Sequence, residues 1–572
     1  MLTNFQEKAN FIWQVADDLL RGAFKKHEYG DVILPFVVLR RLDQVLEDTK
    51  DKVISDFEEY RKQLDEQQLE PVLKKAAGGS SFYNCSFFDL RRLSQDADNI
   101  ELNFNNYLNG YSTNVREILE HFQLEKILER LSRNDLLYML VEKFTEVDLS
   151  PEYVTNEEMG TIFEELLRRF SEMSNETAGE HYTPREVIQL MVSLMFAEHR
   201  DELLGEGLIR SVYDPACGTG GMLITTKDYI KHEINPRVEI LMKGQELNAQ
   251  TYAIAKSDVL IMGENAENIR LGSSFSQDRF KGDRFDYMLS NPPFGVSWKK
   301  EETLIKNEAN DPYGRFTAGT PRTSDGALLF LQHMLSKIQP GGSRIAIIFN
   351  GSPLFTGDAG SGESEIRRWI LENDWLETIV AMPTDMFYNT GISTYIWLLS
   401  SRKPPHRKGK VQLINAVDFY ADMRRSLGSK RKYFTDKNIT DITEIYTCFE
   451  EGEYCRIFDN EDFGYTKVTV EQPLIEHDEI VRDSTGNSKP DTSLRDTEKI
   501  PLKEDIEAYF AREVKPHVPD AWMDRDKDKV GYEISFTRYF YKYTPLRSLE
   551  EIKADILALE AETDGLLGEI FE

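Results

Sequence analysis

The chain has 572 residues, of which 40% are hydrophobic and 29% charged, so it can bury a sizeable core and form more than one domain. No run approaches the roughly 18 consecutive apolar residues that a membrane-spanning helix needs. The first twenty residues mix acids with apolar residues, so we expect this segment not to be a secretory signal. A formal net charge of −30 argues against a protein that grips nucleic acid alone, because such proteins are usually basic.

The four cysteines form no CxxC pair, and no His/Cys cluster has zinc spacing. We therefore expect no metal site and a reduced, cytoplasmic setting.

Residues 1–155 are predicted to form a helical N-terminal domain. Apolar residues recur there at steps of three and four, first through Phe5, Ala9, Ile12, Ala16, Leu19 and Ala23. This spacing places them on one face of a helix. Strand signals are scarce in this part of the chain.

Between residues 156 and 475, short apolar runs alternate with helical stretches. The runs are LIRSVYDP, VEILMKGQEL, FDYMLSNPP, GSRIAIIFN, LETIVAMP and TYIWLLS. Strands that alternate with helices of this length predict an α/β fold with a Rossmann-like, doubly wound and largely parallel sheet. Ligands of such sheets bind beyond the carboxyl ends of the strands.

Three polar stretches are predicted to be loops, over residues 295–325, 356–364 and 476–500. Residues 476–572 are expected to form a linker and a C-terminal helical segment. The last part carries an apolar stripe on an acid-rich helix: Leu546, Leu549, Ile552, Ile556, Leu559, Leu566 and Ile570. The stripe either packs on its own domain or docks in a partner's helical bundle, and the pattern alone leaves both open.

A glycine-rich turn follows the first strand of the α/β region. Gly218, Gly220 and Gly221 remove side chains where a ligand must approach the backbone, and the helix beyond offers free N–H groups to an anion. The next strand ends at Glu246, where a carboxylate can accept both hydroxyls of a ribose. Together these features predict a nucleoside ligand.

The tetrapeptide Asn291-Pro292-Pro293-Phe294 ends another apolar strand. Prolines cannot continue a central strand, so they stiffen the turn and fix the direction of the Asn291 and Pro292 carbonyl groups. Two such acceptors suit an exocyclic amine, which has two hydrogens to donate. Phe294 offers a flat face on which a planar base can stack. This chemistry needs no metal and no nucleophilic side chain.

The motifs DPACGTGG, GQELN and NPPF, in this order, resemble those of amino-group methyltransferases that use S-adenosylmethionine. Upstream, GEHYTPREVIQLMV resembles the segment that closes over the methionine part of the cofactor. KANFIWQVADDLLRG, IFEELLRRFSE, AMPTDMFYNTGISTYIWLL and GYEISFTRYFYKYTPLRSLEEI extend the resemblance to the modification subunits of Type I restriction–modification systems over most of the chain.

This resemblance implies a site for each part of the reaction. The cofactor would contact Tyr182, Thr183, Pro184, Asp214, Ala216, Gly218, Thr219, Gly220, Glu246 and Ser273. Asn291, Pro292, Pro293 and Phe294 would hold a flipped adenine for methylation at N6. Where the family often has an acid against the cofactor's adenine, this chain has Ser273 and Ser274, and a serine hydroxyl can still accept a hydrogen bond.

The resemblance also implies partners. Double-stranded DNA would be the substrate, a separate specificity subunit would read its sequence and carry two modification subunits, and a restriction subunit can join them. Such partners would contribute to DNA binding, which would explain why this chain can be acidic. Basic stretches at 402–410 and 424–432 are candidates for phosphate contact, and solvated loops are the equal alternative.

Three other functions remain open at this point. A glutamine-modifying protein methyltransferase needs the same chemistry, although such enzymes are typically shorter and carry NPPY. A scaffolding subunit with a decayed site is a second alternative, against which the intact motifs argue. Methylation of cytosine at N4 is the third, because base choice depends on the shape of the pocket.

Overall fold

The computed structural model describes residues 5–174, 183–388, 390–477, 479–483, 486–541 and 548–559. The chain divides into two compact units, Met1–Ile534 and Ser535–Glu572, which are described separately. In the described ranges, no helix is long and apolar enough to cross a membrane.

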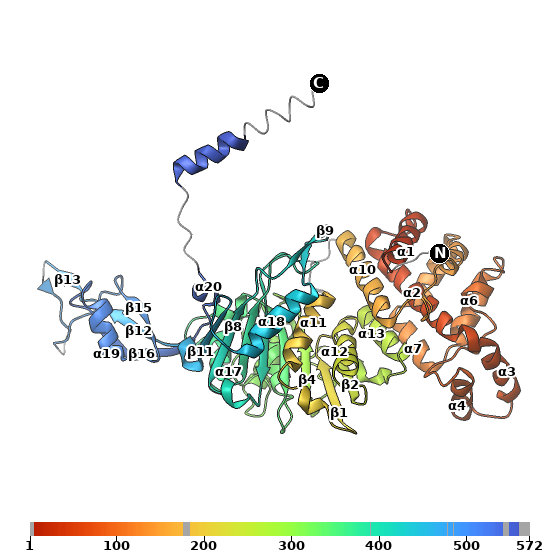
Figure 1. Cartoon of the computed structure of the whole chain (residues 1–572), viewed down its shortest axis with the longest axis horizontal. Coiled ribbons are helices and arrows are strands. Elements are labelled where there is room, and N and C mark those ends of the chain that lie inside the picture. The colour runs from red at the N-terminus through yellow and green to blue at the C-terminus, as the bar shows by residue number, and fades with distance from the viewer. Residues whose placement is uncertain are drawn as a thin grey trace. The chain divides into compact units, whose positions relative to one another are not determined.

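The N-terminal region is entirely helical up to the α/β region, as predicted (Figure 1). Its helices are α1 (Phe5–Leu20), α2 (Tyr29–Leu46), α3 (Lys50–Tyr60), α4 (Glu66–Ala76), α5 (Leu90–Leu93), α6 (Ile100–Asn109), α7 (Thr113–His121), α8 (Leu124–Arg133), α9 (Leu137–Thr145) and α10 (Asn156–Ser174). Helix α2 is buried on nearly all sides and forms the centre of this bundle. Its buried Arg40 and Arg41 donate to the carbonyl groups of Val147 and Val154, each at 2.8 Å, which ties α2 to the segment before α10.

The central sheet has nine strands in the described residues, in the order β11-β8-β6-β7-β5-β4-β1-β2-β3. They are β1 (Ile209–Asp214), β2 (Glu239–Glu246), β3 (Ile269–Leu271), β4 (Tyr287–Ser290), β5 (Arg344–Asn350), β6 (Leu376–Ala381), β7 (Thr394–Ser400), β8 (Lys410–Asn415) and β11 (Cys455–Asp459). Strands β3, β2, β1, β4 and β5 run parallel, and β7 is antiparallel to both of its neighbours. The strand order reverses direction between β1 and β4, which is where ligands of such sheets bind.

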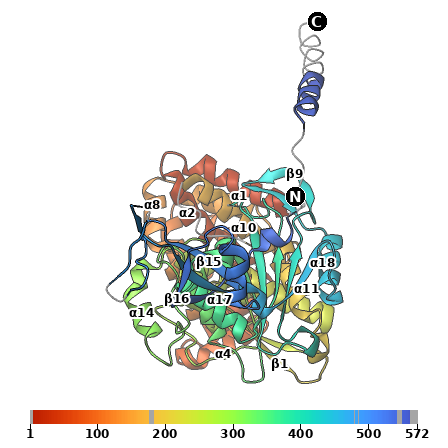
Figure 2. The ribbon, with the colours of Figure 1, turned by 90° about the vertical axis from the view of Figure 1, so that its left-hand side faces the viewer.

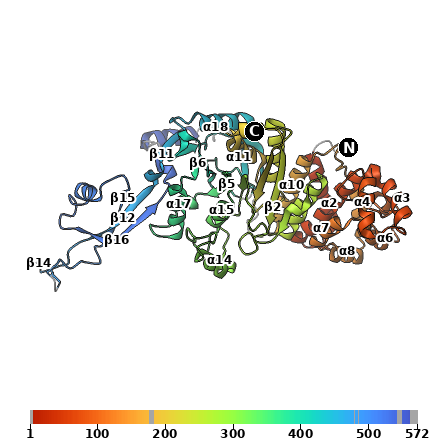
Figure 3. The ribbon, with the colours of Figure 1, turned by 90° about the horizontal axis from the view of Figure 1, so that it is seen from below.

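Helices cover both faces of this sheet. Helices α11 (Arg185–Phe196) and α18 (Asp436–Cys448) lie on one face, and α15 (Ala327–Leu335) and α17 (Gly362–Glu372) lie on the other (Figure 3). The turn after β1 leads into α12 (Gly221–Tyr229), and β2 leads into α13 (Ala249–Ile261). The predicted doubly wound α/β fold with a helical N-terminal region is confirmed.

Helix α13 joins the helical region to the sheet. Its Ala253, Ile254 and Leu260 belong to the same hydrophobic cluster as the residues of α2 and α7. The helix that follows the acid-bearing strand β2 is therefore part of the N-terminal core. This shared core fixes α10, which belongs to the same cluster, relative to the sheet.

Two predicted loops contain ordered structure instead. Residues 295–325 include α14 (Glu302–Ala309) and pack Trp298, Ile305 and Phe316 into a small core with Leu329 of α15. Residues 476–500 include β15 (Asp496–Pro501), which pairs with β12 (Gly464–Glu471), and β12 in turn pairs with β16 (Trp522–Tyr532). This sheet spans the predicted boundary at residue 475, and the sequence did not reveal it because its outer strands are exposed and charged.

The small sheet packs beside α17 (Figure 2). The buried Arg367 of α17 donates to the carbonyl oxygen of Tyr532 at 2.6 Å, and the N–H of Tyr532 donates to Ser364 at 2.9 Å. A separate hairpin, β9 (Ala421–Leu427) and β10 (Lys430–Tyr433), follows β8.

In the C-terminal unit, residues 549–559 form a helix. Its apolar side chains are exposed: Leu549 by 85%, Ile552 by 40%, Ile556 by 59% and Leu559 by 64%. Leu546, Leu566 and Ile570 of the predicted stripe lie outside the described residues. Within this unit, the described part of the stripe is therefore exposed.

Candidate functional site

The glycine turn lies at the end of β1, where the strand order reverses. Gly218 and Gly220 adopt φ angles of 55° and 85°, a left-handed backbone that favours glycine. Asp214, the last residue of β1, is buried and accepts hydrogen bonds from the Ala216 N–H at 2.9 Å and the Ser290 hydroxyl at 2.8 Å. One carboxylate thus joins the ends of β1 and β4.

Glu246 ends β2 and holds the same turn from the other side. Its Oε2 accepts the N–H of Gly218 at 2.9 Å, and its Oε1 accepts the N–H of Asn248 at 2.7 Å. The carboxylate therefore lies against the glycine turn, at the position from which an acid can contact a ribose.

Asn291 directly follows β4 and is 7% exposed. Its Nδ2 donates to the Thr183 hydroxyl at 2.9 Å, so the amide is oriented with Oδ1 as the free acceptor. Oδ1 is buried and has no hydrogen-bond partner among the described residues. A buried acceptor without a donor is costly, and a ligand amine would satisfy it.

A cavity of about 40 Å³ brings these elements together. Asp214, Gly218 and Asn291 line it, and so do Thr183, Ala216 and Thr219. Phe294 is half-buried beside the site and meets Phe387 edge to face, with ring centroids 6.3 Å apart. The acceptor amide and the glycine turn therefore line one cavity.

Burial shapes the electrostatics of this cavity. Burial raises the pKa of Asp214 to about 7, and the nearby Glu246 carboxylate adds to the shift. Burial raises the pKa of Glu164 to about 8, with Glu186 and Asp258 contributing. Two acids with raised pKa values on one cavity wall suit a cationic ligand, which would favour their ionised forms.

The structure places the remaining predicted residues as follows. Tyr182 lies outside the described residues, and Pro184 caps the start of α11. Ser273 does not line the cavity; its hydroxyl donates to Glu301 at 2.6 Å. Sequence patterns missed four cavity-lining residues, which are Glu164, Ile188, Cys217 and Met222.

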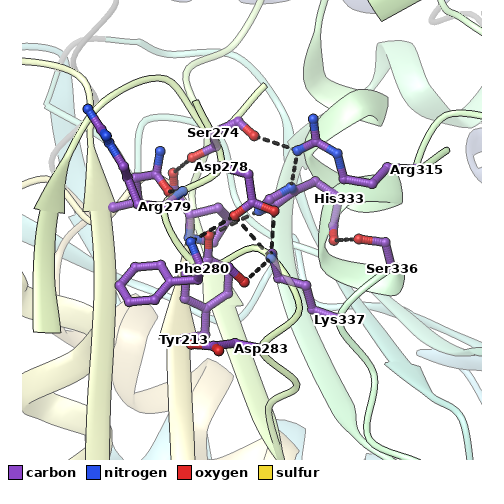
Figure 4. Close-up of polar contacts among 12 residues, drawn as sticks. Tyr213, Ser274, Asp278, Arg279, Phe280, Asp283, Arg315, His333, Ser336 and Lys337 are labelled. Atoms are coloured by element: carbon purple, nitrogen blue, oxygen red, sulfur yellow. Dashed lines mark hydrogen bonds and ion pairs between the residues drawn. The ribbon is translucent and has the colours of Figure 1, made fainter. Parts of the chain in front are cut away.

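A partly buried polar network anchors the segment 295–325 near the site (Figure 4). Arg315 pairs with Glu308 through two hydrogen bonds at 2.6 and 2.8 Å, and it donates to the carbonyl of Ser274 at 2.7 Å. It also donates to Nδ1 of His333 at 2.8 Å, so Nε2 of this ring carries the proton and donates to the Tyr213 hydroxyl at 3.0 Å. Burial lowers the pKa of His333 and keeps the ring neutral.

The two basic stretches differ in what their charges contact. In 402–410, Arg407 is buried and paired with Glu198, and Lys403 is paired with Asp374. In the β9–β10 hairpin, Arg424 and Arg425 are exposed and form no ion pair with a described residue. Most cations of 402–410 are thus paired, with Lys408 exposed and outside any ion pair with a described residue, whereas Arg424 and Arg425 of the hairpin have no such partner.

Comparison with known proteins agrees with this geometry. Residues 154–478 match the family model described as N-6 DNA Methylase, and residues 8–144 match the HsdM N-terminal domain. The MjaIX Type I restriction enzyme methylase subunit of Methanocaldococcus jannaschii is 27% identical over 475 residues, which cover 78% of each chain. The EcoKI methylase subunit of Escherichia coli is 26% identical over 310 residues, 51% of this chain and 54% of that one.

Among solved structures, a type I restriction-modification methyltransferase subunit from Streptococcus thermophilus has the same fold. The TM-score is 0.63 at 22% identity, over 80% of this chain and 97% of that chain. The chain belongs to the N-6 DNA methylase family, whose model matches more than half of it. With its matched N-terminal domain, it is the methyltransferase subunit of a Type I restriction–modification system, an adenine-specific DNA methyltransferase.

Proposed function

We propose that the cavity at the ends of β1 and β4 holds the amino-acid end of S-adenosylmethionine, and that Asn291 to Phe294 hold a flipped adenine beside it. The observation that carries this proposal is the buried Oδ1 of Asn291, which has no hydrogen-bond donor among the described residues. Asn291 lines the same cavity as Asp214 and Gly218. In this assignment, Glu246 holds the ribose, and Thr183, Ala216, Thr219 and Gly220 surround the methionine part. Tyr182, Pro184 and Ser273 remain predicted contacts.

S-adenosylmethionine supplies an electrophilic methyl group when it is bound. Asn291 Oδ1 and the Pro292 carbonyl accept the two hydrogens of the adenine amine and direct its lone pair towards that methyl group. As the nitrogen becomes positively charged, its hydrogens become more acidic and these two bonds strengthen. Asn291 thus stabilises the transition state more than the ground state.

Two neighbours assist Asn291. The Thr183 hydroxyl accepts from Nδ2 and prevents the amide from presenting a donor to the amine. Phe294, half-buried against Phe387, offers a face for stacking of the base.

We propose double-stranded DNA as the substrate and a separate specificity subunit as the source of sequence recognition. The net charge of −30 supports a shared DNA grip, and the exposed apolar helix at 549–559 supports docking in a partner. A solved structure described as showing complex assembly of the type I R-M system has the same fold, with a TM-score of 0.50 at 18% identity over 99% of this chain. A second modification subunit bound through the specificity subunit, and a restriction subunit, complete the proposed assembly.

The β9–β10 hairpin is the proposed site of phosphate contact, because Arg424 and Arg425 are exposed there. A cytoplasmic location is proposed as well, because all four cysteines are free thiols in this structure.

The test is transfer of labelled methyl from S-adenosylmethionine to unmethylated DNA, by this chain alone and with its co-expressed specificity subunit. We expect N6-methyladenine among the product nucleosides only when the partner is present. N4-methylcytosine would identify the other base, and label in protein would identify a glutamine substrate. A chain that binds no cofactor would be a scaffold with a decayed site.

A further inference from the structure

We infer that Glu164 is a further binding residue for the cofactor, and that its carboxylate holds the α-ammonium group at the amino-acid end of S-adenosylmethionine together with Asp214. This inference rests on the proposed function and names one more residue of the same site. Glu164 lies in the segment IFEELLRRFSE, which carries part of the family resemblance, but the sequence assigned it no role in the site.

The position of Glu164 supports this role. It lies on α10 and is 7% exposed, yet it lines the cavity with Asp214, Gly218 and Asn291. Its Oε1 approaches the start of α12 so closely that a Cβ at Gly221 would lie 3.2 Å away. The side chain therefore reaches from the helical region to the glycine turn.

The adjacent acid, Glu165, differs from Glu164 because it has charged partners. Glu165 is also buried, and it accepts hydrogen bonds from Arg168 at 2.9 and 2.8 Å and from Arg169 at 2.6 Å. For Glu164, no described residue provides a hydrogen bond or an ion pair. A buried carboxylate without a partner is destabilising, so Glu164 should either carry a proton or receive a cation.

The charged groups around Glu164 do not supply that cation. Glu186 of α11 is paired with Lys430, and Asp258 of α13 is a second buried acid whose pKa is raised to about 7. Arg185 of α11 interacts with Tyr388 and Asp258, and burial lowers its pKa to about 10. Burial raises the pKa of Glu164 to about 8, with Glu186 and Asp258 adding to the shift, so the cofactor-free protein holds the protonated form at neutral pH.

An ammonium group reverses this preference. When it enters the cavity, the Glu164 carboxyl releases its proton to the buffer and the carboxylate accepts N–H bonds from the ligand. The methionine carboxylate is an anion and suits the N–H groups of the glycine turn and the start of α12. Binding of the amino-acid end is therefore coupled to loss of a proton from Glu164.

The experiment compares two ligands by titration calorimetry on the full chain. S-adenosylhomocysteine keeps the ammonium group, and 5′-methylthioadenosine lacks the whole amino-acid part. For Glu164→Gln, we expect S-adenosylhomocysteine to bind roughly ten- to a hundredfold more weakly, the range for a lost charged hydrogen bond. Binding of 5′-methylthioadenosine should change by less than about twofold, since adenosine contacts are kept.

The wild-type protein provides a second measurement. Its affinity for S-adenosylhomocysteine should rise between pH 6 and pH 8, and the binding heat should vary with the ionisation enthalpy of the buffer because a proton is released. In Glu164→Gln, this proton release should fall. Asp258→Asn, which removes a buried acid that does not line the cavity, is the matched control and should keep the ligand discrimination.

Equal weakening of both ligands in Glu164→Gln, or unchanged binding of S-adenosylhomocysteine, would overturn the inference. If the variant does not fold, wild-type proton release decides, and its absence overturns the inference too. Failure of the wild-type chain to bind either ligand would instead contradict the proposed function.

Discussion

At the scale of single residues, the two ends of the Asn291 side-chain amide have different hydrogen-bonding states. Nδ2 is committed to Thr183, and Oδ1 is buried without a donor among the described residues. A side chain held this way is pre-organised for an amine, because no rotation is needed when the base arrives.

Asn291→Ala should therefore abolish methyl transfer and leave cofactor affinity nearly unchanged. We expect kcat to fall by at least about a hundredfold, the loss typical of one pre-organised hydrogen bond in a transition state. Single-turnover methylation with the specificity subunit measures the first effect, and calorimetry with the cofactor measures the second. Near-normal turnover would refute the role of Asn291.

Glu246 accepts the N–H of Gly218 in the glycine turn and is also the proposed contact for the ribose. Glu246→Ala should weaken cofactor binding by about 1–3 kcal/mol, because it removes a charged hydrogen-bond partner. Glu246→Gln is the matched variant, since it keeps one acceptor, and it should lose less. Unchanged affinity of Glu246→Ala in calorimetry would remove Glu246 from the site.

The raised pKa of Glu164 makes the free energy of unfolding depend on pH. Its pKa is raised to about 8 in the folded chain, above the value of about 4.3 expected on unfolding. Such a group stabilises the fold most below the unfolded pKa, and this contribution is lost as pH rises through the folded pKa.

Glu164→Gln should therefore gain stability over the wild type as pH rises from 5 to 8, by about 1 kcal/mol per pH unit. Urea denaturation of the cofactor-free proteins measures the difference. A constant difference across this range would show that Glu164 is ionised in the folded protein at every pH tested.

At the scale of elements, sequence and structure agree best on the positions of the candidate site residues at the ends of strands. Asp214, Glu246 and Asn291 each follow an apolar run, and a parallel sheet brings such ends to one edge. The sequence could not reveal Glu164 in the same way. Its helix also has Arg168 four residues on, so the spacing suggests an ordinary surface ion pair, yet Arg168 pairs with Glu165.

The small sheet and α14 escaped prediction for a related reason. β16 reads WMDRDKDKVGY, whose charged residues hide its two-residue alternation. The segment 295–325 is polar because its structure depends on hydrogen bonds more than on apolar packing, and it contributes Trp298, Ile305 and Phe316 to a small cluster that Leu329 of α15 completes. Patterns of apolar residues cannot show such an element.

Arg315 is the centre of that hydrogen-bonded support. Arg315→Met should destabilise the protein by about 1.5–3 kcal/mol, because it removes charged hydrogen bonds from the partly buried Glu308 and from the buried His333. Urea denaturation tests this. Lys306→Ala, which removes an exposed pair with Glu302 on α14, is the control and should cost less than about 1 kcal/mol. Equal losses would mean that the network contributes little.

At the scale of the whole molecule, the acidic charge and the C-terminal helix both point to other subunits. The sequence left open whether the apolar stripe packs on its own domain, and the described residues 549–559 expose it. An apolar stripe on an acid-rich helix is a surface that a partner helix can cover.

Removal of all residues after Leu546 should therefore release the specificity subunit and leave the catalytic unit folded. The removed residues belong to the smaller unit and include no residue that lines the cavity, so we expect cofactor affinity and thermal stability to stay within error of the full chain. Co-purification with a tagged specificity subunit measures the association. As a milder variant, replacing Ile552 and Ile556 with Ser should weaken association without shortening the chain. A truncated chain that still co-purifies at full yield would place the contact elsewhere, and methylation of DNA by that complex would confirm that its catalytic site is intact.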